Sequence, residues 1–397
     1  MTADTRQLKE RVQAEVEARR EELIRIADTI HAHPEVAFEE YESAALLSGV
    51  LEENGFTVRR GVAGLETAFV ATMQGGRPGP VVAFLAEYDA LPGLGHACGH
   101  NLIGTSAVGA ALAVRAVLPE LAGTIQVIGT PAEEGGGGKA YLVKGGVFEG
   151  VDVAMMVHPS SRNMTRRRSL ASYKISIEFF GRAAHAAALP DEGINALEAM
   201  ILTFNAINSL RQHLRDDVRI HGIITHGGKA PNIVPDYTAA RFYVRAADTA
   251  YCTEVLEKVR ACAEGAALAT GARLEFKEYA PFYEAMNPNP VLAELVEANM
   301  KALGLTVTQP EPDDRMGSSD MGNVSQVVPA LHPYIAIAPD DVGGHTVEFR
   351  EAAASPDGHK GLILAAKVMA MTAVDLLAEP ENVRRAKEAF ARSKETS

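Results

Sequence analysis

The sequence predicts an α/β protein in which a larger domain with a mostly parallel sheet is interrupted by a smaller α+β domain. Short apolar runs alternate with helical segments over the first 160 residues, as they do in sheets covered by helices. Between residues 171 and 285, polar and apolar side chains alternate along the strands, which is typical of an antiparallel sheet exposed on one face. From Pro288 the first pattern resumes. The larger domain is therefore expected at 1–170 and 286–397, with 171–285 inserted.

The elements of the larger domain follow from apolar spacing. Residues 6–31 and 39–54 predict amphipathic helices, which end before Pro34 and at Asn54. Continuous apolar runs at 81–85, 124–128 and 151–157 predict buried strands, and 103–117 predicts an alanine-rich helix. Residues 362–377 are apolar but contain Lys367 and Asp375, so they predict a buried helix rather than a membrane span.

The inserted domain is expected to hold two helices on one face of a four-stranded antiparallel sheet. The predicted strands are 173–180, 219–225, 238–244 and 273–279, and the predicted helices are 195–211 and 249–270.

Composition narrows the class of function. The 397 residues carry 38 basic and 51 acidic side chains, a net charge of −13, which disfavours nucleic-acid or anionic-membrane partners. Three cysteines, Cys98, Cys252 and Cys262, form no disulfide framework. The charged start of the chain lacks the apolar centre of a signal peptide. We therefore expect a cytoplasmic protein.

Three groups of chemically active residues each follow a predicted strand: Cys98 with His100, Glu133 with Glu134, and His158. Loops at the carboxyl ends of parallel strands carry the sites of α/β proteins. A thiolate and imidazoles suit a divalent metal, and adjacent acids can divide into a metal ligand and a general base. Taken singly, each group also fits a buried thiol, a loop histidine or a solvated turn. Their shared position at strand ends favours one site.

Two glycine-rich segments have different meanings. The tract 135–138 does not fit a phosphate-binding loop, because Ala140 stands where that motif requires Ser or Thr. His345 lies in a late loop after two glycines, which allow close approach of the backbone to a ligand. A turn histidine is the alternative there.

At this point the chain resembles the M20 metallopeptidase family, in its amidohydrolase branch (subfamily D). The similar motifs occur in the family's order between about residues 22 and 378: HAHPE (31–35), YDALP (88–92), HACGH (96–100), PAEE (131–134), GRAAHAA (181–187), PNIVP (231–235) and HTVEF (345–349). Within the branch, residues 219–224, 231–235 and 318–325 are most similar to the peptidase M20 domain-containing protein 2 group, which splits dipeptides such as β-alanyl-lysine. Aminobenzoyl-glutamate hydrolases are near neighbours.

The resemblance implies a two-metal centre. Its ligands are then Cys98, His100, Glu134, His158 and His345. Glu133 is implied as the general base that activates the water, and Asp89 as the carboxylate that orients a ligand. The thiolate favours Zn²⁺, while the carboxylate and imidazoles also admit Mn²⁺ or Co²⁺.

The resemblance also assigns roles in the inserted domain. His185 is implied to reach the active site of a partner subunit and stabilise the oxyanion, which requires a homodimer or a higher homo-oligomer. Asn232 and Arg245 match the pair that holds the substrate carboxylate, and His221 is expected on the face that touches substrate.

Two positions depart from related sequences. Many members of the wider family have His where Glu87 stands, so Glu87 is not counted as a ligand here. Many members of the branch have Asp where Asn101 stands, so no charge is expected behind the ligands at that position. Both departures agree with the dipeptidase-like group.

The sequence therefore predicts a metal-dependent hydrolase that cleaves the amide bond of a dipeptide or N-acyl amino acid with a free carboxylate. An aminobenzoyl-glutamate hydrolase and an N-acyl-amino-acid amidohydrolase are the enzyme alternatives. A non-catalytic binding protein that keeps the fold is the alternative from another class.

Overall fold

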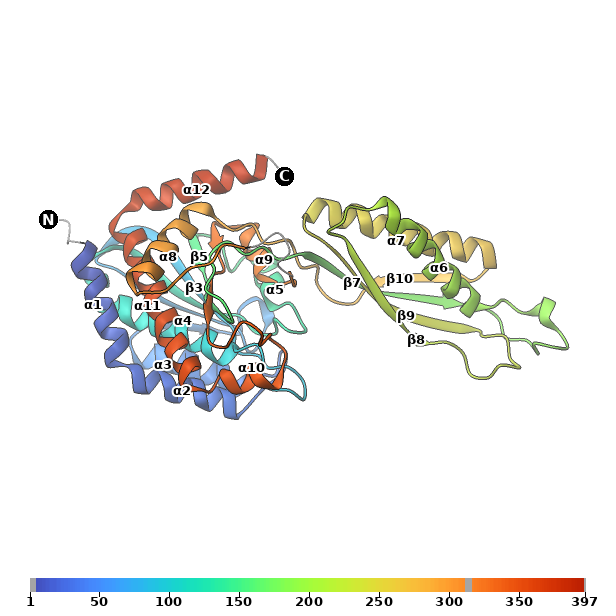
Figure 1. Ribbon diagram of the computed structural model, residues 1–397, viewed down its shortest axis with the longest axis horizontal. Helices are drawn as coiled ribbons and strands as arrows, with labels where there is room; N and C mark the ends of the chain where they lie inside the picture. The colour runs from blue at the N-terminus through green and yellow to red at the C-terminus, as the bar shows by residue number, and fades with distance from the viewer. Residues whose placement is uncertain (1–4, 311–315, 396–397) are drawn as a thin grey trace. The chain divides into compact units, whose positions relative to one another are not determined.

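The computed structural model describes residues 5–310 and 316–395, and these divide into two compact units. Unit 1 comprises 5–168, 286–310 and 320–395, and unit 2 comprises 169–285 and 316–319. The predicted fold class is confirmed: unit 1 contains a parallel-rich sheet and unit 2 a separate antiparallel sheet of four strands (Figure 1).

Unit 1 is built on a six-stranded sheet in the order β1-β2-β4-β3-β5-β11. Strands β4, β3, β5 and β11 are parallel to one another, whereas β2 pairs antiparallel with both β4 and the edge strand β1. A small parallel pair, β6 and β12, stands apart from it. The strands are β1 (Thr57–Arg60), β2 (Phe69–Gln74), β3 (Arg77–Ala86), β4 (Ala122–Gly129), β5 (Val153–Met155), β6 (His158–Ser160), β11 (Ala330–Leu331) and β12 (Tyr334–Ala336).

Both faces of this sheet are covered, which is why its central strands are apolar on both sides. Along β3, Val82 and Phe84 belong to the core formed with helices α4 and α11, and Ala83 and Leu85 to the core formed with α5 and α9. The helices of unit 1 are α1 (Thr5–Ala18), α2 (Arg20–Ala32), α3 (Tyr41–Glu53), α4 (His100–Arg115), α5 (Gly138–Lys144), α8 (Pro290–Ala302), α9 (Met321–Ser325), α10 (Val347–Ala352), α11 (Pro356–Ala378) and α12 (Pro380–Glu395).

Helix α11 is the predicted buried helix. Its length and composition alone would allow it to cross a membrane, but 83% of its most apolar window is buried inside the protein. It packs against α4 and α1, so its apolar surface belongs to the core of unit 1.

Unit 2 has its own core, formed where α6 and α7 cover one face of the sheet β10-β7-β9-β8 (Figure 1). All three strand pairings are antiparallel. Asn195 and Asp248 cap the two helices through their side chains. The elements are β7 (Ala171–Phe180), α6 (Ala196–Leu210), β8 (Arg219–His226), β9 (Tyr237–Ala246), α7 (Thr249–Thr270) and β10 (Arg273–Glu278).

Two predicted elements of unit 1 differ from the structure. The first predicted helix is two helices, because the chain breaks between α1 and α2 at Arg19. The predicted strand at 151–157 ends at Met155, and His158 instead begins β6, which pairs with β12. His158 is therefore held by a strand of its own.

Candidate metal centre

The loop from β3 to α4 places a thiol and an imidazole side by side. Helix α4 begins at His100, and Gly99 before it has φ of 77°, a left-handed conformation that favours glycine. A Cβ at Gly99 would lie 2.7 Å from Cγ of Pro159. Only glycine therefore lets the chain turn between Cys98 and His100 against the segment that carries His158.

The carboxylate of Asp89 links this loop to the one after β4. Its Oδ1 accepts a hydrogen bond from His100 Nδ1 at 2.8 Å, and its Oδ2 accepts one from the backbone N–H of Glu134 at 2.9 Å. Since Nδ1 carries the proton, Nε2 of His100 is the nitrogen left to bind a cation. Asp89 thus occupies a position suited to the orienting role implied for it.

The five expected ligands form two groups that share Cys98. In one, the ligand atoms of Cys98, His100 and His158 lie within 4.8 Å of one another; in the other, those of Cys98, Glu134 and His345 do. His158 Nε2 lies 3.5 Å from Cys98 Sγ, and His345 Nε2 lies 3.4 Å from Glu134 Oε2. Two groups with one common thiolate fit two neighbouring cations.

Backbone strain accompanies this arrangement. Ala132, just before Glu133, and His345 have φ of 62° and 65°, values that residues with a side chain adopt rarely and at a cost of about 1–3 kcal/mol. Strain of this kind persists where the surrounding structure fixes the conformation, and both residues lie at the candidate centre.

Buried polar atoms that make no hydrogen bond indicate whether cations fit at this centre. Nε2 of His100, Oε1 of Glu134 and Oε2 of Glu87 are buried and have no hydrogen-bond partner among the described residues. His100 Nε2 lies 3.3 Å from the Glu87 oxygen and 3.9 Å from the Glu134 oxygen. Buried polar groups are normally satisfied, and a divalent cation would satisfy atoms of this kind.

The pKa values of the candidate ligands and of Glu133 also favour bound cations. Burial, and then the charge of Glu134, raises the pKa of the Cys98 thiol well above its usual value. Burial, followed by the charges of Glu87, Glu134 and Asp320, likewise raises the pKa of Glu133 well above its usual range. Burial lowers the pKa of His158 to about 4, which leaves a neutral imidazole. A thiolate and an ionised Glu133 therefore require added positive charge, which metal ions supply.

The remaining four expected site residues lie in unit 2. His185 and Asn232 are exposed on neighbouring segments, where His185 bridges to Ile233 and the N–H of Ala186 donates to the Asn232 carbonyl at 3.0 Å. Nδ1 of His185 accepts from the backbone N–H groups of Ala187 and Ala188 at 3.3 and 3.2 Å. Nε2 then carries the proton, so the exposed side of this ring is a hydrogen-bond donor.

Arg245 and His221 lie on the sheet face opposite α6 and α7, on adjacent strands. Arg245 pairs with Ser172 near one end of the β7–β9 ladder. The segment with His185 and Asn232 lies beyond the other end, which is the pair Phe180–Tyr237. Eight residues of strand, from 237 to 245, separate the two ends by about 26 Å. Within one chain, Asn232 and Arg245 therefore do not meet. Nε of Arg245 is buried without a hydrogen-bond partner among the described residues.

Sequence reasoning missed a buried ion cluster beside Glu133. Nζ of Lys139 lies 2.5 Å from Glu87 Oε1 and 2.7 Å from Asp320 Oδ1, and none of these side chains is more than 1% exposed. The glycine tract before Lys139 does not fit a phosphate-binding loop and gives no other sign of an ion cluster. His332, expected to be structural, also lies near the centre, with its ring centroid 5.3 Å from that of His158.

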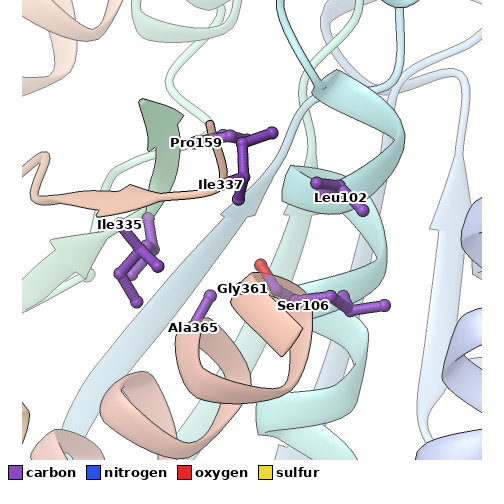
Figure 2. Close-up of a pocket in the computed structure, with 9 residues that line it drawn as sticks. Leu102, Ser106, Pro159, Ile335, Ile337, Gly361 and Ala365 are labelled. Carbon is purple, nitrogen blue, oxygen red and sulfur yellow. The ribbon is translucent and has the colours of Figure 1, made fainter. Parts of the chain in front are cut away.

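A small apolar cavity lies behind the ligands, between α4, α11 and β12 (Figure 2). It has no titratable side chain and so does not compete as the catalytic site. Its lining is Leu102, Ser106, Val157, Pro159, Ile335, Ile337, Gly361, Leu362 and Ala365.

Two ligand groups with a common thiolate, beside an acid that can serve as a base, define a metal-dependent hydrolase. Comparison with known proteins agrees. The chain belongs to the peptidase family M20/M25/M40, whose model matches residues 83–367. It therefore belongs among metallo-hydrolases that cleave amide bonds.

Individual relatives cover nearly the whole chain. It is 38% identical to the Xaa-Arg dipeptidase of Mus musculus, over 96% of this chain and 93% of the relative. It is 33% identical to one of the subunits of the p-aminobenzoyl-glutamate hydrolase of Escherichia coli K12, over 91% and 90%. The crystal structure of a dinuclear metal-binding M20 peptidase from Bacillus subtilis shares the fold, with a TM-score of 0.67 and 24% identity over 91% of this chain and 99% of that one.

Proposed function

We propose that this protein hydrolyses the amide bond of a dipeptide, or of an N-acyl amino acid, that ends in a free carboxylate. The observation that carries the proposal is the pair of ligand groups that share Cys98, with Glu133 beside them. Cys98, His100 and His158 would hold one cation, and Cys98, Glu134 and His345 the other. When bound, the metals supply an acidified water and a polarised carbonyl.

The residues of the chain then have separate tasks. Glu133 takes a proton from the attacking water and returns it to the leaving amine. Nε2–H of His185 donates a hydrogen bond to the oxyanion of the tetrahedral intermediate. Arg245 provides a bidentate clamp for the substrate carboxylate, and Asn232 a neutral donor. His221 contributes to the same binding face as Arg245.

The active unit is proposed to be a homodimer. Asn232 precedes Tyr237, which lies about 26 Å from Arg245 along the sheet of one chain, so a single carboxylate held by both requires two subunits. Zn²⁺ is the proposed metal because a thiolate is common to both groups, with Mn²⁺ or Co²⁺ as alternatives. The three cysteines Cys98, Cys252 and Cys262 are free, which fits the proposed cytoplasmic location.

Substrate choice is tested with a panel assayed on metal-loaded protein: dipeptides with carboxy-terminal Arg or Lys, N-acetyl amino acids and p-aminobenzoyl-glutamate. We expect the highest kcat/KM on the dipeptides, in line with the 38% identity to a Xaa-Arg dipeptidase. Preference for p-aminobenzoyl-glutamate would support the second candidate, which the 33% identical relative suggests. Absence of turnover on every compound would favour a binding protein.

The base assignment is tested by Glu133→Ala. We expect kcat to fall by at least about 10²–10⁴-fold, the range that general acid–base catalysis supplies, while two metal ions remain bound per subunit. Metal counting on the same preparation is the control, because it separates loss of the base from loss of the centre. Activity equal to that of the wild type would show that another group accepts the proton.

A further inference from the structure

The two oxygens of Glu87 have different surroundings. Glu87 directly follows β3 and is 1% exposed. Its Oε1 accepts a hydrogen bond from the ammonium group of Lys139 at 2.5 Å. Its Oε2 has no hydrogen-bond partner among the described residues and faces Nε2 of His100 at 3.3 Å. One oxygen is therefore fixed by an ion pair, and the other is left directed at a metal-binding nitrogen.

The nitrogen that it faces also makes no hydrogen bond among the described residues. His100 is fully buried, its Nδ1 is held by Asp89, and its Nε2 has no hydrogen bond among the described residues. The ligand atom that His100 offers lies within 4.8 Å of those of Cys98 and His158. A carboxylate oxygen and an imidazole nitrogen that are both buried and make no hydrogen bond among the described residues, side by side next to a thiol, mark a shared cation position.

We propose that Oε2 of Glu87 is a further ligand of the cation held by Cys98, His100 and His158. The proposal rests on the two-metal centre described under Proposed function and adds one oxygen to it. The donor set of that cation becomes one sulfur, two nitrogens and one oxygen. An added hard oxygen suits Mn²⁺ and Co²⁺ better than sulfur and nitrogen alone do.

Lys139 and Asp320 are the positioning residues of this ligand. The ammonium of Lys139 lies between Glu87 Oε1 and Asp320 Oδ1, and Oδ2 of Asp320 accepts the backbone N–H of Lys139 at 2.9 Å. The lysine is thus anchored through both its backbone N–H and its ammonium group. Because it engages Oε1 alone, it fixes the rotation of the carboxylate and leaves Glu87 as a ligand through a single oxygen.

The test measures metal binding, not turnover. Full-length protein is stripped with a chelator and titrated with Co²⁺, whose visible absorption reports coordination number, and with Zn²⁺ in competition with a chelating indicator. We expect Glu87→Gln to weaken the binding of one of the two Co²⁺ ions by at least about tenfold, as loss of a group around a metal does. The visible absorption of that ion should change as well. Cys98→Ala is the positive control, since it removes a ligand of both groups.

Asp375→Asn is the matched control, because Asp375 is a mostly buried acid that pairs with Lys9 at 2.5 Å and belongs to none of the candidate ligand groups among the described residues. We expect its Co²⁺ affinity and absorption to stay within about twofold of the wild type. Equal losses in Glu87→Gln and Asp375→Asn would overturn the proposal, because the effect would then come from the loss of a buried ion pair and not from the loss of a ligand. Wild-type affinity and absorption in Glu87→Gln would overturn it as well.

A second variant guards against misfolding. Glu87→Asp keeps the charge opposite Lys139 but withdraws the carboxylate by one methylene, so it should also lose affinity for one ion. Thermal unfolding of each metal-free variant shows whether it is folded. Failure of the wild type to bind two Co²⁺ ions would contradict the proposed two-metal function instead, which keeps the two failures distinguishable.

Discussion

At the scale of single residues, Glu40 shows how a buried carboxylate can hold the turn that carries the proposed base. Its Oε1 accepts the backbone N–H groups of Phe38 and Ala132 at 3.0 and 2.8 Å, and its Oε2 accepts the hydroxyl of Thr67 at 2.9 Å. Phe38 and Ala132 both have positive φ. Glu40 therefore stabilises two strained turns, one of which leads directly into Glu133.

Burial, assisted by the charge of Asp89, raises the pKa of Glu40 from 4.5 to about 7. The folded state then binds more protons than the unfolded state between these values, so the unfolding free energy falls as pH rises from about 4.5 through 7. We expect Glu40→Gln, which can keep the three hydrogen bonds, to remove this loss of about 3 kcal/mol. Denaturant unfolding of metal-free protein at pH 5 and pH 8 measures it.

Glu39→Gln is the control for that experiment, because the neighbouring Glu39 is exposed and its charge is solvated in both states. Its unfolding free energy should follow the wild-type pH dependence. If Glu40→Gln also follows the wild type between pH 5 and pH 8, the buried carboxylate is not the source of the dependence.

Part of the candidate metal centre could be predicted from residue types in the sequence, and the rest is visible only from contacts in the folded structure. Cys98 and His100 are two positions apart, and a thiol next to an imidazole signals a metal without any structure. Glu40 reaches Ala132 across 92 residues, and Lys139 reaches Asp320 across 181. Glutamate, lysine and aspartate side chains are usually solvated. Only the fold therefore shows that Glu40, Lys139 and Asp320 are buried and paired.

At the scale of elements, β8 is one of the two edge strands of the unit 2 sheet. Its side chain Ile223 is 65% exposed, and an open strand edge with an apolar side chain is a template for pairing with another chain. Exposed Ile201 and Leu202 on α6 add apolar surface to the same unit. This pattern supports the homodimer proposed above, with β8 at its interface.

We therefore expect Ile223→Lys to shift the protein from dimer to monomer and to lower turnover, since a charge at the centre of an apolar interface is costly to bury. Sedimentation velocity and kcat/KM measured on the same samples test this. Leu268→Lys on α7, where the leucine is 88% exposed, is the matched control and should stay dimeric and active. A wild-type protein that is monomeric and active would contradict the proposal.

Elements with a strong apolar pattern were the most predictable ones. The short apolar runs of β3 and β4 predict buried strands, and the 22 residues of α7, which is buried along one side, match the predicted helix from end to end. Strand β1 is largely exposed and contains two arginines, so its sequence carries no strand signal. The pairing of His158 into β6 depends on β12, which lies about 175 residues later.

At the scale of the whole molecule, the chain divides the proposed catalytic groups between two units with separate cores. The proposed metal-binding groups, Asp89 and Glu133 lie in unit 1. His185, Asn232, Arg245 and His221 lie in unit 2, with the His185–Asn232 end and the Arg245 end separated along the sheet. Such a division makes activity depend on assembly if the two ends serve different active sites.

Mixed dimers test that dependence. Glu133→Ala and His185→Ala should each be nearly inactive alone. In a mixed dimer, the site with intact Glu133 receives an intact His185 only if that histidine comes from the partner subunit. Random assembly of equal amounts makes half of the dimers mixed, each with one complete site of two, so co-expression should restore about a quarter of wild-type activity.

The competing arrangement gives a different number. If His185 serves the site of its own chain, every site in a mixed dimer lacks either Glu133 or His185, and co-expression restores nothing. Separate purification tags on the two variants isolate the mixed dimer, for which the expected activity rises to about half of the wild type. Because both single variants keep all metal-binding residues and the β8 edge, a failure of restoration cannot be attributed to loss of the metals or of the interface. It would place His185 in its own subunit's site and leave the separation of Asn232 from Arg245 as the remaining reason for requiring a dimer in catalysis.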